Sequence, residues 1–496
     1  MIGEEMITEP GTRAGVDFAA LRDHPWRMLI GGSLISAAGT YPTIDPTTEE
    51  VLARVPDGGA ADVDLAVRAA HEAAPAWRAT EPRFRAAVVR VLAAVLREHA
   101  GELATLDSLD LGSPYRMMLE DVERAAESLE LFAGWALELK GEVIPASSGH
   151  LHYTVREPFG VVGRIIPFNH PIMFAAGKIA APLVAGNTVV LKPAHQTPLS
   201  ALRLGELAAG VLPPGVLNIV TGSGPEPGEA IARHPRVRRI AFIGSERTGR
   251  AIQAAAAAVT VKHITLELGG KNAMLVLPDA DLDSVAAAAV QGMNITASTG
   301  QSCGSTSRLL VPEDVAGTMA DLVAERMSAL RLGDPLDTAT EVGPLVTAEH
   351  AASVLASIRQ AAGSGARIRC SATPDRGFFV APTVISGVSS SDPVARQEIF
   401  GPVLTVLPYR DEKHAVEIAN SVDYGLTAAV WTNDLDRAHR LAAMLDAGFV
   451  WVNGVSRHFP GVPYGGVKSS GVGREESLDE LLGFTQVKAV NVALRD

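Results

Sequence analysis

The spacing of apolar residues predicts a helical layer in the first third of the chain. From residue 62 to about residue 139 the sequence is rich in alanine, and apolar residues recur three and four positions apart, most clearly over 86–96. This spacing places apolar side chains on one face of a helix. We therefore expect several helices here, each with one face against a core.

After Gly141 the pattern changes to that of short strands. Val143-Ile144 and residues 151–155 flank a polar turn at 147–149, which predicts a two-stranded hairpin arm. The last segment, 485–494, alternates apolar and polar residues as a half-buried strand does. Because both segments have open edges, we expect them to pair with each other or with a neighbouring subunit.

Strand-like apolar runs then alternate with helical ones. A first series occupies 160–166, 175–185, 187–191, 199–209, 216–220 and 239–243, and a second runs from 272 to 452. Alternation of this kind implies parallel sheets covered by helices on both faces. The predicted fold class is α/β, with two Rossmann-like parallel-sheet domains and a small β oligomerisation arm.

Composition limits the possible functions. The 496 residues, 47% of them hydrophobic and 20% charged, suit a globular protein of roughly two to four domains. Acidic residues outnumber basic ones by 56 to 43, which gives a net charge of −13 and leaves no basic stripe. A nucleic-acid partner is therefore not expected.

Cysteine usage and the terminus bear on metal binding and location. Only Cys303 and Cys370 occur, far apart, so neither a zinc cluster nor a disulfide framework is expected. Glu4, Glu5 and Glu9 stand where a secretion signal would carry basic residues. The apolar runs fall short of the roughly 20 residues that span a bilayer. We expect no metal, no membrane contact and a cytoplasmic protein.

Two glycine-rich segments carry the candidate chemistry: Glu267-Leu268-Gly269-Gly270-Lys271 and Gly300-Gln301-Ser302-Cys303-Gly304-Ser305. A thiolate attacks carbonyl carbon, and a carboxylate can take the proton from the water that later releases the acyl group. An isolated cysteine and glutamate would more often be a core residue and a surface charge. The interpretation therefore depends on the flanking residues.

Seven motifs, in their order along the chain, resemble those of the aldehyde dehydrogenase superfamily. They are Pro167-Phe168-Asn169, Lys192-Pro193, Phe242-Ile243-Gly244-Ser245, Glu267-Leu268-Gly269-Gly270-Lys271, Gly300-Gln301-Ser302-Cys303, Glu398-Ile399-Phe400-Gly401-Pro402 and Pro463-Tyr464-Gly465-Gly466-Val467-Lys468. The resemblance covers nearly the whole chain. It implies an oxidoreductase that converts an aldehyde to a carboxylic acid with a nicotinamide cofactor.

The resemblance assigns roles to four catalytic residues. Cys303 would attack the aldehyde, and Asn169 would donate to the oxyanion of the thiohemiacetal together with the Cys303 backbone N–H. Glu267 would activate the water that hydrolyses the thioester. Since relatives that acylate coenzyme A generally lack this glutamate, its presence favours a free acid. Lys178 matches a position that helps to place groups around the thiol, with a solvated helix lysine as the alternative.

The cofactor site differs from the common dinucleotide fingerprint, because no strand is followed by a clean G-x-G-x-x-G. Instead, Gly244, Ser245 and Gly249 follow an apolar strand and open an alanine-rich helix, whose N-terminus suits a pyrophosphate. The resemblance completes the cofactor set, which is Ile166, Pro167, Phe168, Lys192, His195, Gly244, Ser245, Gly249, Leu268, Glu398 and Phe400.

His195 departs from the family pattern, which usually has a glutamate there that binds the ribose hydroxyls and repels a 2′-phosphate. A neutral histidine can still bond a hydroxyl, and a protonated one tolerates phosphate. We expect NAD as the cofactor, with NADP as the alternative. His195 as a loop residue without influence on this choice is a third interpretation.

The substrate wall that the resemblance implies is roomy and partly aromatic. It comprises Met173, Phe174, Gly177, Ser302, His458 and Tyr464. This favours a medium-size or aromatic aldehyde over acetaldehyde, although core packing is an equally good account of any single aromatic residue. Arg457 keeps a semialdehyde open, because it could pair a distal carboxylate. A betaine-aldehyde-type substrate is a further alternative.

The same resemblance divides the chain into domains. Residues 1–137 and 157–265 would bind NAD(P), 266–470 would carry the nucleophile, and 138–156 with 471–496 would form the arm and C-terminal strand. A homodimer or homotetramer is expected. Two rival functions are a non-catalytic protein on the same scaffold, and a cysteine hydrolase without redox chemistry, which would need a histidine base.

Overall fold

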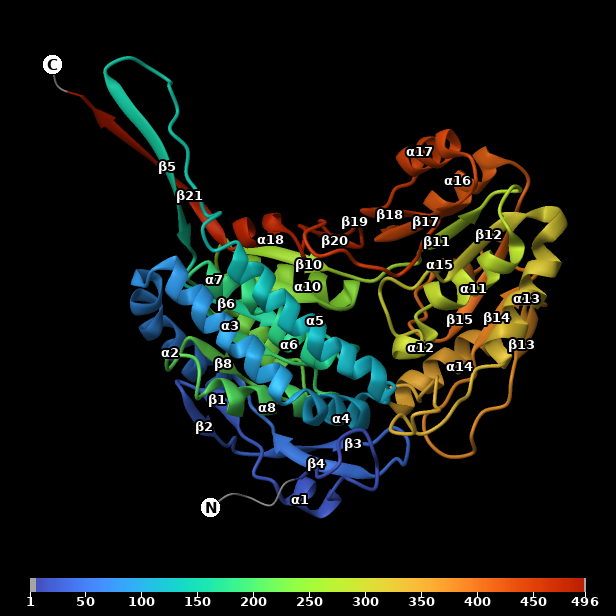
Figure 1. Ribbon diagram of the computed structural model, residues 1–496, viewed down its shortest axis with the longest axis horizontal. Coiled ribbons are helices and arrows are strands. Elements are labelled where there is room, and N and C mark those ends of the chain that lie inside the picture. Colours follow the sequence, from blue (N-terminus) through green and yellow to red (C-terminus); the bar gives the residue numbers. More distant parts are fainter. Residues whose placement is uncertain (1–5, 495–496) are drawn as a thin grey trace.

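The computed structural model describes residues 6–494 and shows two α/β halves with a projecting β arm (Figure 1). Glu4 and Glu5 lie outside the described residues. Within the described part, no helix is long and apolar enough to cross a membrane.

The first half is built on a sheet of the order β2-β1-β8-β7-β6-β9-β10-β20. Its strands are β1 (Met28–Ile30), β2 (Ser33–Ile35), β6 (Val161–Ile165), β7 (Thr188–Lys192), β8 (Leu217–Ile219), β9 (Val237–Ile243), β10 (His263–Glu267) and β20 (Gly471–Val472). The central five strands run parallel, as predicted, whereas β1 and β20 add antiparallel edges. The fold is therefore α/β with a mostly parallel sheet.

Helices cover both faces of this sheet, because successive strand residues point to opposite sides. On one face Ile165, Val190 and Ile240 pack with α2 (Ala60–Ala79), α9 (Glu226–Arg233) and α10 (Glu246–Ala257). On the other face Val162, Val189 and Leu191 pack with a larger helical layer. That layer consists of α3 (Pro82–Glu98), α4 (Ala100–Leu111), α5 (Tyr115–Gly134), α6 (Pro171–Gly177), α7 (Ala180–Val184) and α8 (Leu199–Ala208). The helices predicted over 62–139 are present and end at Gly134, but α2 covers one face of the sheet and α3, α4 and α5 cover the other.

The second half has a sheet of the order β13-β14-β15-β12-β11-β17-β18. Its strands are β11 (Ala273–Val276), β12 (Arg308–Pro312), β13 (Arg367–Cys370), β14 (Thr383–Ser386), β15 (Val403–Tyr409), β17 (Thr427–Trp431) and β18 (Phe449–Val452), of which only β13 pairs antiparallel. The helices around it are α11 (Leu282–Gly292), α12 (Ile295–Ser298), α13 (Ala316–Ser328), α14 (Ala348–Gly363), α15 (Pro393–Arg396), α16 (Glu412–Asn420) and α17 (Leu435–Met444), with the short η1 (Glu313–Val315). The second α/β series is thus confirmed.

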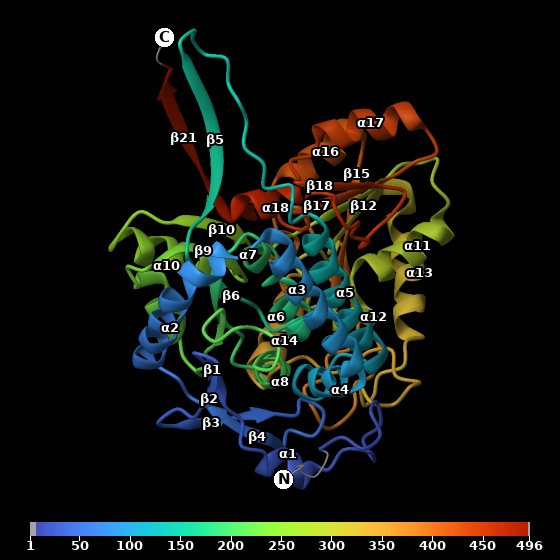
Figure 2. The ribbon, with the colours of Figure 1, turned by 60° about the vertical axis from the view of Figure 1, so that its left-hand side comes forward.

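The arm consists of β5 (His150–Pro158) and β21 (Thr485–Ala493), paired antiparallel from Thr485↔Pro158 to Ala493↔His150. It extends away from both halves in two views (Figures 1 and 2). The pairing of the two open segments with each other is one of the two predicted outcomes. The hairpin predicted between 143–144 and 151–155 is reduced to one antiparallel bridge between Val143 and Tyr153, with the Ile144 N–H donating to the His152 carbonyl at 2.9 Å. Residues 143–144 therefore form no strand. Pro145 follows directly and has no N–H to continue a ladder.

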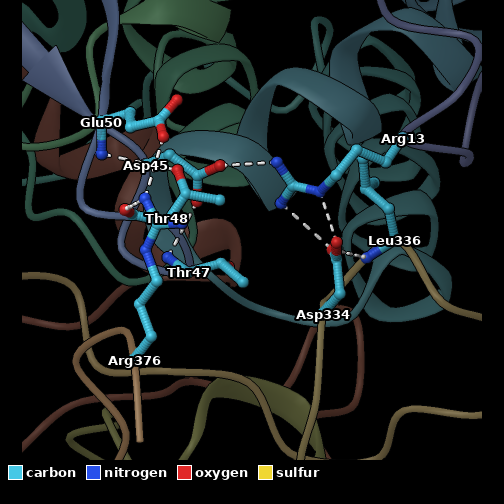
Figure 3. A network of polar contacts seen from close by, with 8 residues as sticks. All are labelled: Arg13, Asp45, Thr47, Thr48, Glu50, Asp334, Leu336 and Arg376. Atoms are coloured by element: carbon cyan, nitrogen blue, oxygen red, sulfur yellow. Dashed lines mark hydrogen bonds and ion pairs between the residues drawn. The ribbon is translucent and has the colours of Figure 1, made fainter.

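An N-terminal segment ties the two halves together on the side away from the arm. Arg13 donates to Asp45 at 2.7 Å and also pairs with Asp334, while Arg376 donates to the Thr48 carbonyl and to Glu50 (Figure 3). Asp45 lies in the turn between β3 (Thr40–Ile44) and β4 (Val51–Pro56), which follow α1 (Phe18–Asp23). The remaining elements are β16 (Tyr424–Gly425), β19 (Val467–Lys468) and α18 (Leu478–Gly483). The domain boundaries drawn from the sequence stay a prediction.

Candidate active site

Three candidate segments follow neighbouring parallel strands of the first sheet. β6 ends at Ile165 and leads into 166–169, β9 ends at Ile243 and leads into Gly244-Ser245, and β10 ends at Glu267. Ile165 pairs with Phe242, and Ile243 pairs with Glu267, so the three strands end at one edge of the sheet. Ligands of open parallel sheets bind at such carboxyl ends.

Cys303 lies in a loop of the second half, between α12 and β12. Gly300 turns this loop in the left-handed region with φ +74°, and a Cβ there would stand 2.5 Å from the Gly401 carbonyl oxygen, so only glycine fits. Buried Gln301 accepts from the Val346 N–H at 3.1 Å. Asn272 donates to the carbonyl oxygens of Cys303 at 2.7 Å and Ser305 at 2.9 Å. The loop is thus fixed on both sides of the thiol.

The half-buried Cys303 thiol lies near two carboxylates. Burial, together with the charges of Glu398 and Glu267, raises the pKa of Cys303 to about 12. The Tyr464 hydroxyl, which would be 3.3 Å from a Cβ on Gly304, and the Cys303 backbone N–H act in the opposite direction. The structure therefore brings Cys303, Glu267 and Glu398 together as the sequence predicts, and it keeps the thiol protonated near neutral pH.

Glu267 is 4% exposed, and within residues 6–494 neither of its carboxylate oxygens has a hydrogen-bond partner. A Cβ on Gly465 would stand 2.7 Å from its Oε1, so the carboxylate passes close over that glycine. Burial and the neighbouring Glu475 carboxylate raise the pKa of Glu267 well above its usual range, against the charge of Lys178. When it is ionised, a carboxylate with a raised pKa is a stronger proton acceptor than one in solvent.

Lys178 follows α6, and its ammonium lies 2.8 Å from Glu475 and 3.8 Å from Glu476. Arg164 on β6 lies 2.7 Å from Glu475, and His458 lies 2.9 Å from Glu476. Burial alone would lower the pKa of Lys178, but the surrounding carboxylates outweigh it and raise the pKa. Lys178 is therefore a buried cation within an ion network beside Glu267. Its assignment as a catalytic residue stays a prediction.

Asn169 is 3% exposed and lies in the turn between β6 and α6. Thr197 donates to the Phe168 carbonyl at 3.3 Å, and His170 pairs with buried Asp121 at 2.6 Å. These contacts hold the residues on either side of Asn169. Its expected role as a donor to the oxyanion stays a prediction.

The second cofactor segment follows β9. The Ser245 side chain caps α10 by accepting from Thr248 N–H at 3.3 Å, and Gly244 N–H donates to the Glu267 carbonyl at 3.0 Å. Gly249 packs against Leu268, since a Cβ there would stand 2.8 Å from the Leu268 side chain. The first turn of α10 is thus held against the segment that carries Glu267.

Glu398 reaches the same segment from the second half. Its carboxylate accepts from Gly270 N–H at 3.0 Å, and a Cβ on Gly269 would stand 1.9 Å from its Oε2. Burial raises the pKa of Glu398 to about 7, against the Gly270 hydrogen bond and the charge of Lys271. Phe400, two residues on, contacts Phe168 edge to face at 5.7 Å. Glu398 and Phe400, which were predicted to hold the nicotinamide ribose, therefore contact the segments that follow β10 and β6.

Lys192 ends β7, is 8% exposed, and forms no ion pair within the described residues. Burial lowers its pKa to about 8. His195 follows in the same loop, and burial and the charge of Lys192 lower its pKa, while Glu349 acts to raise it. The Lys192 ammonium, the N-terminus of α10 at Ser245 and the backbone of Gly269-Gly270 beside Glu398 can all donate hydrogen bonds. A dinucleotide carries the oxygen atoms that accept such bonds.

The predicted substrate residues fall into two groups. Met173, Phe174 and Gly177 lie on α6, where a Cβ on Gly177 would be 3.5 Å from Ser128 of α5. His458 lies 4.2 Å from Tyr464 between ring centroids, and Tyr464 adjoins the half-buried Ser302-Cys303-Gly304 segment. The second group is thus beside the thiol, whereas Phe174 packs into the core of the first half.

Several residues that shape the site were missed in the sequence. Asn272 holds the nucleophile loop, Glu475 and Glu476 pair with Lys178, and His350 contacts Phe400. Asn272 directly follows the Glu267 motif, so its place in the sequence could have identified it as a site residue. Glu475 and Glu476 follow the motif that ends at Lys468 by seven and eight residues, but no local pattern marks them or His350.

The comparisons with known proteins agree with this geometry. The family model described as the aldehyde dehydrogenase family matches residues 35–490. The aldehyde dehydrogenase tropH of Talaromyces stipitatus is 44% identical over 465 residues, 91% of this chain and 90% of the relative. Retinaldehyde dehydrogenase 3 of Mus musculus is 41% identical over 463 residues, 92% and 90% of the two chains. The structure of an aldehyde dehydrogenase from Bacillus cereus in complex with NAD+ superposes with a TM-score of 0.93 at 39% identity, covering 96% of this chain and 98% of that one.

Proposed function

This chain belongs to the aldehyde dehydrogenase family of oxidoreductases, and we propose that it oxidises a medium-size or aromatic aldehyde to the free carboxylic acid with NAD+. The observation that carries the proposal is the buried Glu267 carboxylate, without partners in the described chain, beside the half-buried Cys303 thiol. A nucleophile next to a carboxyl group of raised pKa suits acyl formation followed by hydrolysis.

In the first step Cys303 attacks the aldehyde carbon. Because burial and two carboxylates raise the pKa of the thiol, its proton must leave as the sulfur attacks, and water at the half-buried Cys303 can carry that proton to solvent. The thiohemiacetal oxyanion then accepts hydrogen bonds from the Asn169 amide and the Cys303 backbone N–H. One such donor contributes on the order of 100-fold in rate in other enzymes.

NAD+, when bound, supplies the acceptor for the hydride that leaves the thiohemiacetal carbon. The chain's own residues for holding it are Lys192, the capped Ser245 turn and Glu398 with Gly270. Glu267 then takes a proton from water, whose oxygen attacks the thioester carbon. The C–S bond breaks, the carboxylic acid leaves, and the proton on Glu267 passes to the Cys303 sulfur. Because neither oxygen of Glu267 has a hydrogen-bond partner within the described residues, the carboxylate can accept this proton without first breaking a contact.

The proposed substrate class follows from the aromatic side chains next to the Cys303 thiol. The rings of Tyr464, His458 and Phe449 lie within 4.2 to 6.2 Å of one another, which suits a flat or bulky apolar group. The name of the mouse relative also points to a bulky apolar aldehyde. A semialdehyde is the second candidate, because Arg457 lies at that wall, 5.2 Å from the ring of Phe459. A charged head group of the betaine-aldehyde type is the third.

The preference for NAD+ rests on the NAD+ complex of the Bacillus cereus relative and on the lowered pKa of His195. A neutral imidazole can bond a ribose hydroxyl but offers no charge to a 2′-phosphate. NADP+ is the alternative, because Lys192 supplies a cation in the same loop. We also propose that β5 and β21 form the contact of a homodimer or homotetramer, since the arm keeps exposed apolar residues such as Leu151, Val487 and Val492.

The test is absorbance at 340 nm with a panel of aliphatic, aromatic and charged aldehydes, each with NAD+ and with NADP+. Turnover is expected with bulky uncharged aldehydes and NAD+. Cys303→Ala should abolish it, whereas Cys370→Ala, at an exposed cysteine on the edge strand β13, should retain it. Full activity of Cys303→Ala, or no reduction with any aldehyde, would contradict the proposal.

A further inference from the structure

His458 lies in the loop after β18, and its side chain is 39% exposed. Its Nδ1 lies 2.9 Å from the carboxylate of Glu476. Because an ionised carboxylate can only accept, Nδ1 carries the hydrogen, and in the neutral ring Nε2 is then an acceptor. Within residues 6–494, Nε2 has no hydrogen-bond partner. The pair therefore leaves one unused acceptor on the imidazole.

Glu476 has an unusual backbone for a glutamate. Its φ of +64° lies in the left-handed region, where residues persist when surrounding contacts hold them and where functional sites are frequent. Its N–H donates to the Glu480 carboxylate at 2.7 Å, and its carbonyl accepts from the Gly461 N–H at 3.0 Å. Gly461 belongs to the same loop as His458. The loop is thus bound to Glu476 at two points.

Cations surround the Glu476 carboxylate. Burial alone would raise its pKa, but the charge and hydrogen bond of His458 and the charges of Lys178 and Arg124 lower the pKa to about 2. The carboxylate is therefore ionised near neutral pH, and it accepts the hydrogen bond of His458. Since the Lys178 ammonium lies 3.8 Å away, the carboxylate is already paired. His458 is the member of the pair that is open to a ligand.

The His458 ring belongs to the aromatic wall that begins at the thiol. Its centroid is 4.2 Å from that of Tyr464 and 6.2 Å from that of Phe449, to which it is nearly parallel at 20°. The Tyr464 hydroxyl adjoins the thiol segment, 3.3 Å from where a Cβ on Gly304 would stand. An aromatic aldehyde with its carbonyl carbon at Cys303 can thus lay its ring along Tyr464 and reach His458 with its far end.

We propose that His458 is a specificity-determining residue that selects aromatic aldehydes with a ring hydroxyl: the hydroxyl donates to Nε2, and Glu476 positions the imidazole for it. The inference rests on the proposed function and narrows its aromatic class. A site that offers an acceptor to a substrate hydroxyl discriminates against the analogue that lacks the hydroxyl, because the acceptor is then left without a partner.

A packing role for His458 would predict a different result. Loss of packing against Phe449 and Tyr464 lowers kcat/KM for all aromatic aldehydes together. Loss of the acceptor changes the ratio of kcat/KM between an aldehyde with a ring hydroxyl and one with a methyl group in the same place. That ratio is therefore the quantity to measure.

The experiment uses two pairs of aldehydes, 3-hydroxybenzaldehyde with 3-methylbenzaldehyde and 4-hydroxyphenylacetaldehyde with 4-methylphenylacetaldehyde, at pH 7.5 with NAD+ and fluorescence of the reduced cofactor. In at least one pair the hydroxyl-to-methyl ratio of kcat/KM should fall about threefold to tenfold in His458→Phe, the size of one hydrogen bond. His458→Gln, whose amide oxygen can accept from the hydroxyl, should recover most of the ratio. His439→Phe, the same exchange at an exposed histidine of α17, is the control.

A binding measurement separates this inference from the proposed oxidation. The amides that correspond to the four aldehydes are not oxidised, and they should protect Cys303 from iodoacetamide in a Cys370→Ala background. In at least one pair the hydroxyl-bearing amide should protect at a several-fold lower concentration than its methyl analogue, and His458→Phe should remove the difference. Absent aldehyde oxidation in the unaltered protein would contradict the proposed function alone, because protection needs no turnover.

Two results would overturn the inference. One is an unchanged hydroxyl-to-methyl ratio in His458→Phe for both pairs of aldehydes. The other is equal protection by the two amides of each pair in the protein that retains His458. The second result is decisive even if His458→Phe does not fold.

Discussion

The ammonium of Lys178 lies 2.8 Å from the carboxylate of Glu475, a residue almost 300 positions further along the chain. Both side chains are nearly inaccessible to solvent, and Arg164 binds the same carboxylate at 2.7 Å. Burying charges is costly unless they are paired, so this network must form together or not at all. It joins the end of α6 to the segment that follows β20 and places the Lys178 ammonium near Glu267.

Removing one member of this network should be strongly destabilising. Lys178→Met leaves Glu475 with Arg164 alone, and breaking a buried pair in this way costs about 3 to 5 kcal/mol. We expect a clear fall in the melting temperature, measured by calorimetry. Lys140→Met, which removes an exposed lysine paired with Glu138, is the matched control and should change it little. If the two variants melt alike, the network contributes nothing to stability.

The reactivity of Cys303 should depend on pH in a defined direction. Since its pKa is raised to about 12, alkylation by iodoacetamide should be slow at pH 7 and rise continuously toward pH 11. Glu398→Gln removes a nearby negative charge, lowers the thiol pKa and should accelerate alkylation at pH 9 about threefold to tenfold. Because the pKa of Glu398 is about 7, the gain should vanish below pH 7, where that carboxyl group is already neutral. Glu325→Gln, on the exposed side of α13, should leave the profile unchanged.

Glu267 should be needed for hydrolysis more than for oxidation. In Glu267→Gln the amide cannot take a proton from water, so the thioester accumulates. Stopped-flow absorbance should show a burst of reduced cofactor of about one equivalent per subunit, followed by turnover reduced at least 100-fold, within the range of general-base effects. Normal steady-state turnover would show that another group activates the water.

His195 should influence the choice of cofactor. His195→Glu introduces a carboxylate close to Lys192, in the loop after β7, which can bond ribose hydroxyls and repels a 2′-phosphate. The ratio of kcat/KM for NAD+ to that for NADP+ should rise about tenfold, mainly through weaker use of NADP+. His195→Gln, which adds no charge, is the control. Equal ratios in all three proteins would remove His195 from the specificity argument.

The sequence by itself determined the family and most secondary structure, and it predicted the reacting groups. Helices over 62–139 and the strands that end at Ile165, Ile243 and Glu267 follow from local periodicities of 3.6 and 2 residues, which need no knowledge of distant contacts. The motifs around Cys303 and Glu267 could be recognised by their glycines, of which Gly300 has a positive φ of 74° that favours glycine.

The tertiary structure decided which distant side chains meet, and with them the charge states of the site. The high pKa of Cys303 depends on burial and on the charge of Glu398, almost a hundred residues away, and the pairing of Lys178 depends on Glu475. The left-handed Phe400 and its contact with His350 are invisible in a local pattern, because the contacts that hold it come from other segments. Residues 143–144, which Pro145 follows, form no strand, and β5 pairs with β21 instead. Burial and long-range pairing set these features, and both arise only when the chain is folded.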